Sequence, residues 1–295
     1  MLFLANVSGY SVRFRGKYLF TIKPSSVVLV TVLTLLVLFT ALPLVYLVVT
    51  AFKPIDELYL FPPTFFTRRP TVDNFKTLLN SLGNSEVPFI RYIFNSIFTT
   101  VATVFLTVFV CSLAAFGLVK QKPRGADLIF ALFLMALMFP GTVTQIPNYL
   151  IIKKLGFLNN YLSLIVPKVA VAFNFFLVKQ FMEQIPDSLI EAARIDGASQ
   201  WKTFWRIVMP NVRGAWLTLL MLSVQTLWGT GANNYIYKDE LKTLNYALGQ
   251  IMSGGVARAG VGAAVTLFMM IVPIAIFIFS QNNIVETMSS SGMKD

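Results

Sequence analysis

The sequence predicts an all-α membrane protein with six transmembrane helices. The chain has 295 residues, of which 56% are hydrophobic and 13% are charged, and its mean hydropathy is +0.70. Ordinary soluble domains carry roughly 25% charged residues, so this composition excludes a disordered protein and most soluble enzymes. The apolar residues also form runs that can cross a hydrocarbon core of ~30 Å, which takes roughly 20 residues of α-helix.

Six apolar runs divide the chain into predicted spans. The first has no charged residue between Lys23 and Lys53, and it is too long and too far from the N-terminus for a typical signal peptide. The second is equally free of charge between Arg91 and Lys120. The six predicted spans are residues 27–52, 92–119, 128–152, 161–182, 215–237 and 261–280.

The basic residues between the spans predict the orientation. The segment before the first span carries four basic residues and no acid, and the loop after the second span carries three more. In a six-span chain both segments lie on one side, and short basic loops stay in the cytoplasm. Residues 53–91, which this orientation places outside, carry five basic residues and four acids. This connection is long, and long connections contribute less to the charge rule than short loops do. We therefore expect a multi-pass protein of a bacterial cytoplasmic membrane, with both termini in the cytoplasm.

The net charge of +11 is explained by the same arrangement. In a soluble protein it would suggest binding to nucleic acid. Here the basic residues lie mostly between apolar runs, so we interpret them as charges that orient the chain in membrane lipid, and we expect no nucleic-acid partner.

Prolines interrupt several of the predicted spans. A proline inside a helix removes a backbone hydrogen bond and bends the chain, and such breaks persist in membranes where protein or a water-filled cavity satisfies the freed groups. The prolines therefore indicate either packing kinks or a polar pathway. Lys168, which follows one of them, either extends to the outer surface or lines such a pathway. The prolines are Pro43, Pro140, Pro147, Pro167 and Pro273.

The residue inventory argues against catalysis by this chain. It has no histidine and a single cysteine, Cys111, which excludes histidine-based acid–base chemistry, thiolate metal clusters and internal disulfides. The segment Gly197–Thr203 is superficially similar to a phosphate-binding loop, but Lys202 stands where the second glycine is required. We predict no catalytic residue, no metal site and no cofactor bound by this chain.

The connection 184–214, between the fourth and fifth spans, has clear local signals. Ser188 and Glu191 form the S-x-x-E pattern of a capping box and predict the start of a short helix. Gly197 predicts its end, because glycine adopts the left-handed conformation of a C-terminal cap at little cost. This first helix has two small residues, Ala192 and Ala193. They either allow another protein to approach the helix backbone closely or belong to a solvated surface helix.

A second short helix is predicted directly after the first. Ser199 is a plausible N-cap residue, and Pro210 is expected to end the helix. Four apolar residues recur at positions i, i+3, i+4 and i+7 and form one face, suited to the membrane interface or the ends of the spans. They are Trp201, Phe204, Trp205 and Val208.

This connection resembles the EAA motif of the membrane subunits of bacterial ABC importers. That motif reads E-A-A, three residues, glycine, about nine residues, an apolar residue, and a leucine–proline pair or similar. Met209 stands where leucine is usual. The matching residues are Glu191, Ala192, Ala193, Gly197, Ile207 and Pro210, with Asp196 just before the glycine.

The resemblance extends over most of the chain and points to the carbohydrate-importer subgroup, similar to the maltose-type second permease. Residues 50–79 are similar to the segment that follows the first span in that subgroup. Residues 281–295 resemble its C-terminal tail, in which Gly292 and Lys294 match the glycine and lysine that approach the ATPase. Residues 228–237 depart from the subgroup, because the acid usual there is absent.

The resemblance implies a type I ABC importer permease fold and a set of partners. The 184–214 connection would supply a coupling helix for two cytoplasmic ATPase subunits, which bind ATP and Mg²⁺ and carry out the hydrolysis. An extracytoplasmic solute-binding protein would deliver a carbohydrate, most plausibly an oligosaccharide, for import by alternating access. Six spans make half of a pathway in this architecture, so we expect a second, related permease subunit that is a different chain, with a homodimer as the alternative.

Amide and aromatic side chains in the spans are the candidates for sugar contacts. Each of them could instead pack between helices, where such hydrogen bonds are worth about 1 kcal/mol or less. Two other functions stay open at this stage: a permease for another class of solute, and a self-sufficient secondary transporter with inverted repeats and intramembrane ionisable residues. The candidate contacts are Gln145, Asn148, Tyr149, Asn174, Gln225, Trp228 and Asn233.

Overall fold

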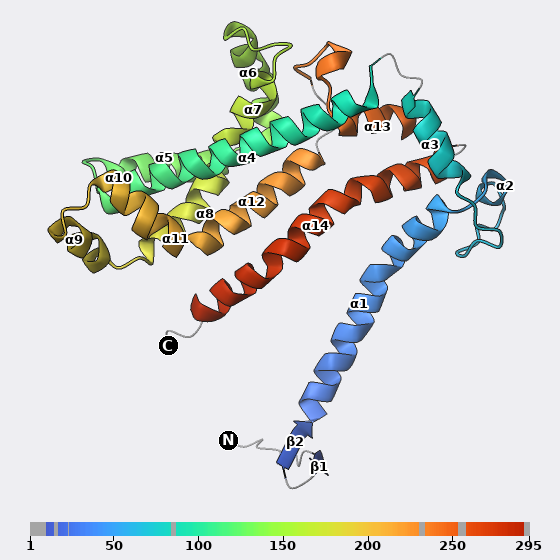
Figure 1. Ribbon diagram of the computed structural model, residues 1–295, viewed down its shortest axis with the longest axis horizontal. Coiled ribbons are helices and arrows are strands. Elements are labelled where there is room, and N and C mark those ends of the chain that lie inside the picture. Colours follow the sequence, from blue (N-terminus) through green and yellow to red (C-terminus); the bar gives the residue numbers. More distant parts are fainter. Residues whose placement is uncertain are drawn as a thin grey trace.

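The protein is a helical bundle built around three long helices (Figure 1). The computed structural model describes residues 10–14, 17–22, 24–83, 87–229, 234–252 and 258–291. The long helices are α1 (Pro24–Ala51), α4 (Phe89–Lys120) and α14 (Ala259–Ser291). They contain the predicted spans 27–52, 92–119 and 261–280, except that α1 ends one residue early.

Three pairs of shorter helices are each bent at a break. If the first two pairs are one crossing each and the third pair crosses through α12, the described residues supply six, as the sequence predicts. The pairs are α5 (Ala126–Leu137) with α6 (Gly141–Lys154), bent by 108°; α7 (Leu162–Val169) with α8 (Ala172–Glu183), bent by 44°; and residues 200–211 with α12 (Arg213–Trp228), bent by 75°.

Two predicted spans are therefore not continuous helices, which corrects the expectation for residues 128–152 and 161–182. In the first, Pro140 has an extended backbone (φ −65°, ψ 143°) and stands at the N-cap of α6. In the second, Val171 is extended (φ −88°, ψ 122°) and precedes α8. Twelve residues of α-helix extend only about 18 Å, so neither α5 nor α8 crosses a ~30 Å hydrocarbon core alone.

The fifth predicted span, 215–237, is also shorter than expected. Helix α12 ends at Trp228, and Gly229 is its C-cap. Glycine weakens a helix because it loses more backbone freedom than other residues, and a second glycine follows at position 231. After residues 230–233, which lie outside the described part, the chain forms the short η2 (Asp239–Leu241) and then α13 (Leu244–Met252).

The N-terminal segment adds a feature that an all-α fold does not include. Strands β1 (Tyr10–Phe14) and β2 (Lys17–Ile22) form an antiparallel hairpin with Tyr10 opposite Ile22. The hairpin lies at the far end of α1, away from the rest of the bundle (Figure 1). The sequence analysis interpreted this segment only through its charge.

One end of the bundle is closed by a layer of short helices, here called the distal layer: α2 (Ile55–Leu58), α3 (Asp73–Gly83), η2 and α13. Asn74 of α3 donates hydrogen bonds to the backbone oxygens of Ala51 (2.9 Å) and Lys53 (2.7 Å) at the end of α1. A Cβ at Gly260 would lie 2.6 Å from the Asn74 side chain, so only glycine allows α14 to begin there.

Asn95 of α4 holds η2 in the distal layer in the same way, through its side-chain amide. Its amide donates to the backbone oxygens of Glu240 and Lys242, both at 2.8 Å. Together these contacts place the C-terminal end of α1 and the N-terminal ends of α4 and α14 at the distal layer. The opposite ends of these helices, including the beginning of α1 and the end of α14, therefore lie on the other side of the bundle, together with the 184–214 connection (Figure 1).

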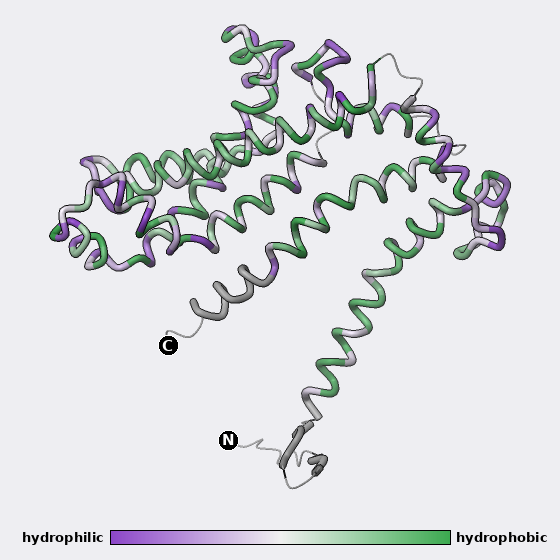
Figure 2. The backbone as a smooth tube through the Cα atoms, viewed as in Figure 1, coloured by the Kyte–Doolittle hydropathy of each residue, from purple (hydrophilic) through white to green (hydrophobic). Residues whose placement is uncertain are grey.

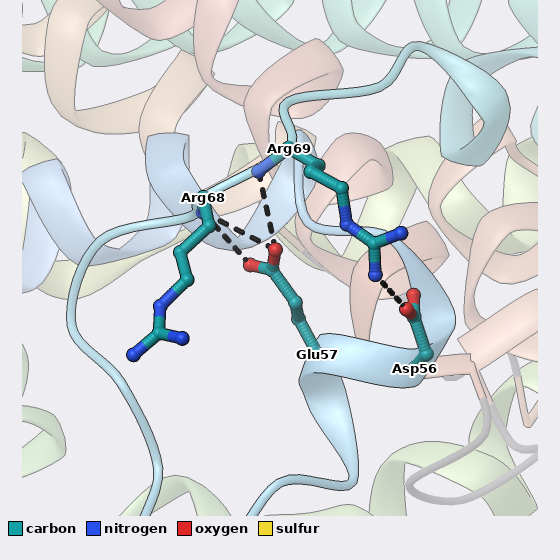
Figure 3. A network of polar contacts seen from close by, with 4 residues as sticks. All are labelled: Asp56, Glu57, Arg68 and Arg69. Carbon is teal, nitrogen blue, oxygen red and sulfur yellow. Dashed lines mark hydrogen bonds and ion pairs between the residues drawn. The ribbon is translucent and has the colours of Figure 1, made fainter.

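Polar contacts fix the loop between α2 and α3 (Figure 3). The Glu57 carboxylate is buried and accepts hydrogen bonds from the backbone N–H groups of Arg68 and Arg69 at 3.1 Å. Burial alone would raise the pKa of Glu57, but these hydrogen bonds and that of Thr67 hold it below its ordinary value. The Arg69 side chain pairs with Asp56. The loop is therefore built around a satisfied buried carboxylate.

Figure 2 shows apolar residues along the long helices and polar residues gathered in the distal layer and in the 184–214 connection. Most of α1 is exposed: none of the 18 residues of its most apolar window is buried. Elsewhere the buried apolar residues form two clusters. The distal core includes Tyr92, Val104, Trp228, Leu244 and Leu248. The coupling-end core, where the 184–214 connection packs, includes Cys111, Phe116, Phe175, Val178, Met182, Ile190, Phe204, Val208 and Leu219.

Candidate coupling site and translocation cavity

The first helix of the 184–214 connection is α9 (Asp187–Ile195), and it begins differently from the prediction. Pro186 stands at the N-cap with an extended backbone (φ −60°, ψ 135°), and no side chain caps the helix. Ser188 is therefore already inside the helix, and the predicted capping box with Glu191 is wrong. Pro186 fixes the backbone angle φ before the helix and has no N–H group that needs a partner. Asp187, which follows it, pairs with Lys120 of α4.

Asp187 joins α9 to the end of α4. Its two carboxylate oxygens accept from Lys120 Nζ at 2.8 Å and from Lys122 Nζ at 2.9 Å. Lys120 Nζ also donates to the backbone oxygen of Ile185 at 2.5 Å, and its side chain is only 3% exposed. The two ammonium groups lower the pKa of Asp187 to about 2. At neutral pH the Asp187 carboxylate is therefore ionised, and its two ion pairs fix the start of α9 against the end of α4.

The end of α9 confirms the prediction for Gly197. This glycine has φ +71°. Its N–H donates to Arg194 O at 3.0 Å, and the N–H of Ala198 donates to Ala193 O at 2.9 Å. These are the two bonds of a Schellman cap. The chain therefore leaves the helix through a turn that a residue with a side chain would strain.

The two faces of α9 differ, and they correct one expectation. Ile190 and Ala193 are buried, with 4% and 5% exposure. Ala193 therefore lets this chain's own helices approach one another, and it does not belong to an open small-residue surface. Glu191, Ala192, Asp196 and Gly197 are exposed. The exposed face also carries Ile195, whose 87% exposure is unusual for a large apolar residue.

The second helix begins as predicted, with the Ser199 side chain accepting from Lys202 N–H at 3.2 Å. It consists of α10 (Gln200–Thr203), the π-helical turn η1 (Phe204–Val208) and α11 (Met209–Asn211). The helix ends at Asn211, one residue after Pro210, so the expected end is confirmed. The chain bends only after Asn211.

The apolar face of this second helix is divided between core and surface. Phe204 and Val208 are buried in the coupling-end core, and the Phe204 ring lies 5.4 Å from that of Phe116 on α4. Trp201 and Trp205 are 56% and 42% exposed. Phe204 and Val208 therefore attach the connection to the bundle, whereas Trp201 and Trp205 remain accessible at its surface. The predicted tail residues Gly292 and Lys294 lie outside the described residues.

A cavity of about 730 Å³ lies where two of the bent helix pairs, α5–α6 and α7–α8, meet α4. Both breaks contribute to its wall, through Phe139 and Gly141 on one side and Ala170 and Val171 on the other. This agrees with the rule that irregular backbone at membrane depth lines a cavity. Among its polar lining residues are Thr99, Thr103, Gln145, Asn148, Ser163, Lys168, Asn234 and Tyr235.

Two of the seven predicted sugar contacts, Gln145 and Asn148, line this cavity. Tyr149 lies on the same helix, and its hydroxyl bonds to that of Tyr237 at 2.8 Å. Asn174 is buried in α8, and Gln225 is exposed on α12. Neither of these two is among the cavity residues.

Trp228 and Asn233 complete the set. Trp228 packs in the distal core, and its indole N–H donates to Met269 O at 2.9 Å, so here it joins α12 to α14. Asn233 lies outside the described residues.

The sequence analysis missed the hydroxyl groups of α4. Thr99, Thr103 and Thr107 are all buried and follow one another at a spacing of four residues, which places them on one face of the helix. The first two line the cavity. The sequence contains a pattern that predicts this face. Small polar residues at helical spacing, in a span without charges, indicate a side of the helix that faces away from lipid.

Comparisons with known proteins agree with this geometry. The family model described as binding-protein-dependent transport system inner membrane component matches residues 82–290. The probable ABC transporter permease protein y4oR of Sinorhizobium fredii is 31% identical over 261 residues, which are 85% of this chain and 90% of that one. The polygalacturonan/rhamnogalacturonan transport system permease protein YtcP of Bacillus subtilis is 28% identical over 212 residues, 70% of each chain.

A solved structure has the same fold. It belongs to a bacterial ABC transporter involved in the import of the acidic polysaccharide alginate, and it aligns with a TM-score of 0.74 over 88% of this chain and 95% of that one, at 21% identity. The predicted permease fold is confirmed by this alignment.

Proposed function

Because the chain belongs to the family of binding-protein-dependent transport system inner membrane components, we propose that it is a permease subunit of an ATP-driven importer that takes up an oligosaccharide. The observation that carries the proposal is α9, a capped helix that packs on the bundle by one face and exposes Glu191 and Ile195 on the other. The carbohydrate class is supported by relatives whose names refer to polysaccharide transport.

In this proposal, the exposed face of α9 docks on a cytoplasmic ATPase. Two copies of that subunit bind ATP and Mg²⁺ and carry out the hydrolysis. Closure of the ATPase pair moves α9, and the motion reaches the spans through Phe204, which packs against Phe116 of α4, and through Asp187, which is paired with Lys120. Gly292 and Lys294 of the tail contact the same partner.

The proposed orientation places α9 and both termini in the bacterial cytoplasm. The distal layer then lies outside, where a solute-binding protein delivers the sugar. The apolar exposed surface of α1 faces lipid or a second permease subunit. We propose that this subunit is a different chain, which completes the wall of the cavity. Gln145 and Asn148 then bind sugar hydroxyls.

The proposal is tested by substrate uptake into proteoliposomes that contain the assembled importer, its binding protein and internal ATP. Glu191→Ala removes a side chain on the exposed face of α9 without disturbing the core, and we expect ATP-dependent uptake to fall by about tenfold or more. The matched control is Asp127→Ala, an exposed acid in the first turn of α5 at the same end. It should leave uptake within about twofold, since one exposed charge contributes little on its own.

Two results would count against the proposal. Uptake that proceeds at the same rate without ATP would favour a self-sufficient secondary transporter. Equal uptake by the Glu191→Ala and Asp127→Ala variants would show that α9 does not transmit the work of the ATPase.

A further inference from the structure

The cavity between the bent helix pairs has one charged side chain in its wall, that of Lys168. This lysine is half-buried near the end of α7, directly after Pro167. Within residues 24–83, 87–229, 234–252 and 258–291, no acidic side chain lines the cavity, and Lys168 forms no ion pair. Residues 230–233, just before the lining residue Asn234, contain no acid in the sequence.

The breaks in the two bent pairs bring helix ends to the same cavity. Helices α6 and α8 begin there, at Gly141 and Ala172, and helices α5 and α7 end there, beside Leu137 and Ala170. A helix dipole is positive at the N-terminus and negative at the C-terminus, so the four ends largely offset one another. The Lys168 ammonium is therefore the net charge of the cavity, and no described carboxylate neutralises it.

An uncompensated lysine at membrane depth is costly and usually marks a pathway or a ligand. Lys179, in the same bent pair but beyond the cavity, is compensated: it pairs with Glu183 at 2.6 Å and lies 3.7 Å from the centre of the Phe130 ring. Lys168 has neither kind of partner in the described structure. The difference leaves the Lys168 ammonium available to a ligand in the cavity.

We infer that the cavity accepts a saccharide that carries a carboxylate, namely a uronic-acid oligosaccharide. This inference rests on the proposed function and specifies its substrate. The carboxylate bonds to the Lys168 ammonium, while Gln145, Asn148 and the buried hydroxyl of Thr103, which has no partner among the described residues, bind sugar hydroxyls.

The size of the cavity fits this class of ligand. Pockets for small ligands have volumes of roughly 300–1,000 Å³, and about 730 Å³ falls inside that range. Neutral polar groups along the wall suit the many hydroxyls of a sugar chain. The Lys168 ammonium lies beside the α7–α8 break, so the charged part of the substrate is held there.

The test compares two forms of one saccharide in proteoliposomes with the complete importer and its binding protein. The probes are trigalacturonate and its trimethyl ester, in which three methyl groups remove the three carboxylate charges. The wild-type chain should carry the acid at least about tenfold faster than the ester, because a hydrogen bond to a charged group far exceeds one to a neutral group. Lys168→Gln should slow uptake of the acid by about tenfold and leave uptake of the ester within about twofold.

Two further variants keep this test specific. Lys168→Arg retains the charge and should retain the preference for the acid. Lys154→Gln removes an exposed lysine at the end of α6 that does not line the cavity, and it should behave like the wild type. Assembly of each variant is checked by size-exclusion chromatography of the purified complex.

The outcomes separate this inference from the proposed function. Equal uptake of acid and ester by the wild-type chain, or equal slowing of both probes by Lys168→Gln, would overturn the inference. So would uptake of a neutral trisaccharide, maltotriose, without uptake of trigalacturonate, although the proposed function would survive. If none of the three probes enters in the presence of ATP, both the inference and the proposed function are wrong.

Discussion

The coupling end and the cavity of this chain are built on opposite principles. At the coupling end, two short helices are closed by local caps and pack Phe204, Val208 and Ile190 into one apolar core. At the cavity, two helix pairs are broken, and polar side chains such as Gln145 face an open space. In the proposed function, the first region transmits force and needs rigidity. The second must admit and release a solute, so its groups stay available to a ligand.

The comparison predicts which region tolerates substitution. A residue in the coupling-end core is held by many neighbours, so its removal costs stability. A residue in the cavity wall makes few contacts within the chain, so its removal costs binding while the fold remains. The predictions that follow test this difference, in order of decreasing expected effect.

The largest effect is expected from Phe204→Ala. The side chain is 1% exposed and packs against Phe116, so its loss leaves a cavity and should lower the free energy of unfolding by about 3–5 kcal/mol. Thermal unfolding of the purified complex measures this. Trp201→Ala, in the same helix but 56% exposed, should cost markedly less. Equal losses for the two variants would show that the coupling-end core is not where the structure places it.

A smaller effect is expected from Gly197→Ala. The glycine has φ +71°, and an L-residue in this region is strained by about 1–2 kcal/mol. Gly117→Ala is the control, because it lies inside α4 with nothing within 4 Å of a new Cβ. Alanine there should be neutral or stabilise the helix by about 0.5–1 kcal/mol. The same assay should therefore show a lower free energy of unfolding for Gly197→Ala and an unchanged or higher one for Gly117→Ala. A decrease for both variants would contradict the role of Gly197 as the C-terminal cap of α9.

Gln145→Leu tests the cavity side of the comparison. We expect the free energy of unfolding to stay within about 0.5 kcal/mol, as for most substitutions outside the core. The concentration of sugar that gives half-maximal uptake should rise by about tenfold, because one hydrogen bond contributes about 1 kcal/mol and an unmatched polar group of the ligand adds to the loss. A large loss of stability with unchanged uptake would assign Gln145 to packing.

The smallest effect concerns the ion pair at the start of α9. Its two lysines hold the pKa of Asp187 at about 2, below the ordinary value of 3.8. A lowered pKa means that the pair stabilises the fold above pH 3.8 and that this contribution disappears as the pH falls from 3.8 towards 2. Asp187→Asn should therefore be less stable than the wild type at pH 6, and the difference should shrink near pH 2.5. A difference that is constant over this range would contradict the pairing.

The sequence predicted the coupling end well where the signals are local. Gly197 and Ser199 act as caps within a few residues of their own positions, so their roles follow from residue type and spacing. The start of α9 was missed because Asp187 bonds to Lys120, which is 67 residues away. The burial of Ala193 was missed for the same reason, since it depends on how α9 packs against its neighbours.

The cavity was less predictable. The long spans follow from hydropathy alone, but the breaks near Pro140 and Val171 depend on the space that the assembled helices leave. Gln145 and Asn148 were identified because amides in an apolar run are unusual. Trp228 was a candidate for the same reason, yet its indole bonds to Met269 on α14. Residue type identifies polar groups at depth, and only the packing shows which of them face the cavity.

The central claim is that the exposed face of α9 contacts an ATPase in the cytoplasm. It is tested most directly by placing a cysteine at Ile195 in a Cys111→Ala background, since Cys111 is the single cysteine of the chain. A photo-crosslinker on that cysteine should join the chain to the ATPase subunit. The same label at Leu79, which is 66% exposed on α3 in the distal layer, should not. The claim is contradicted if an active complex gives no ATPase adduct from position 195, or if an impermeant reagent added outside intact cells labels that position.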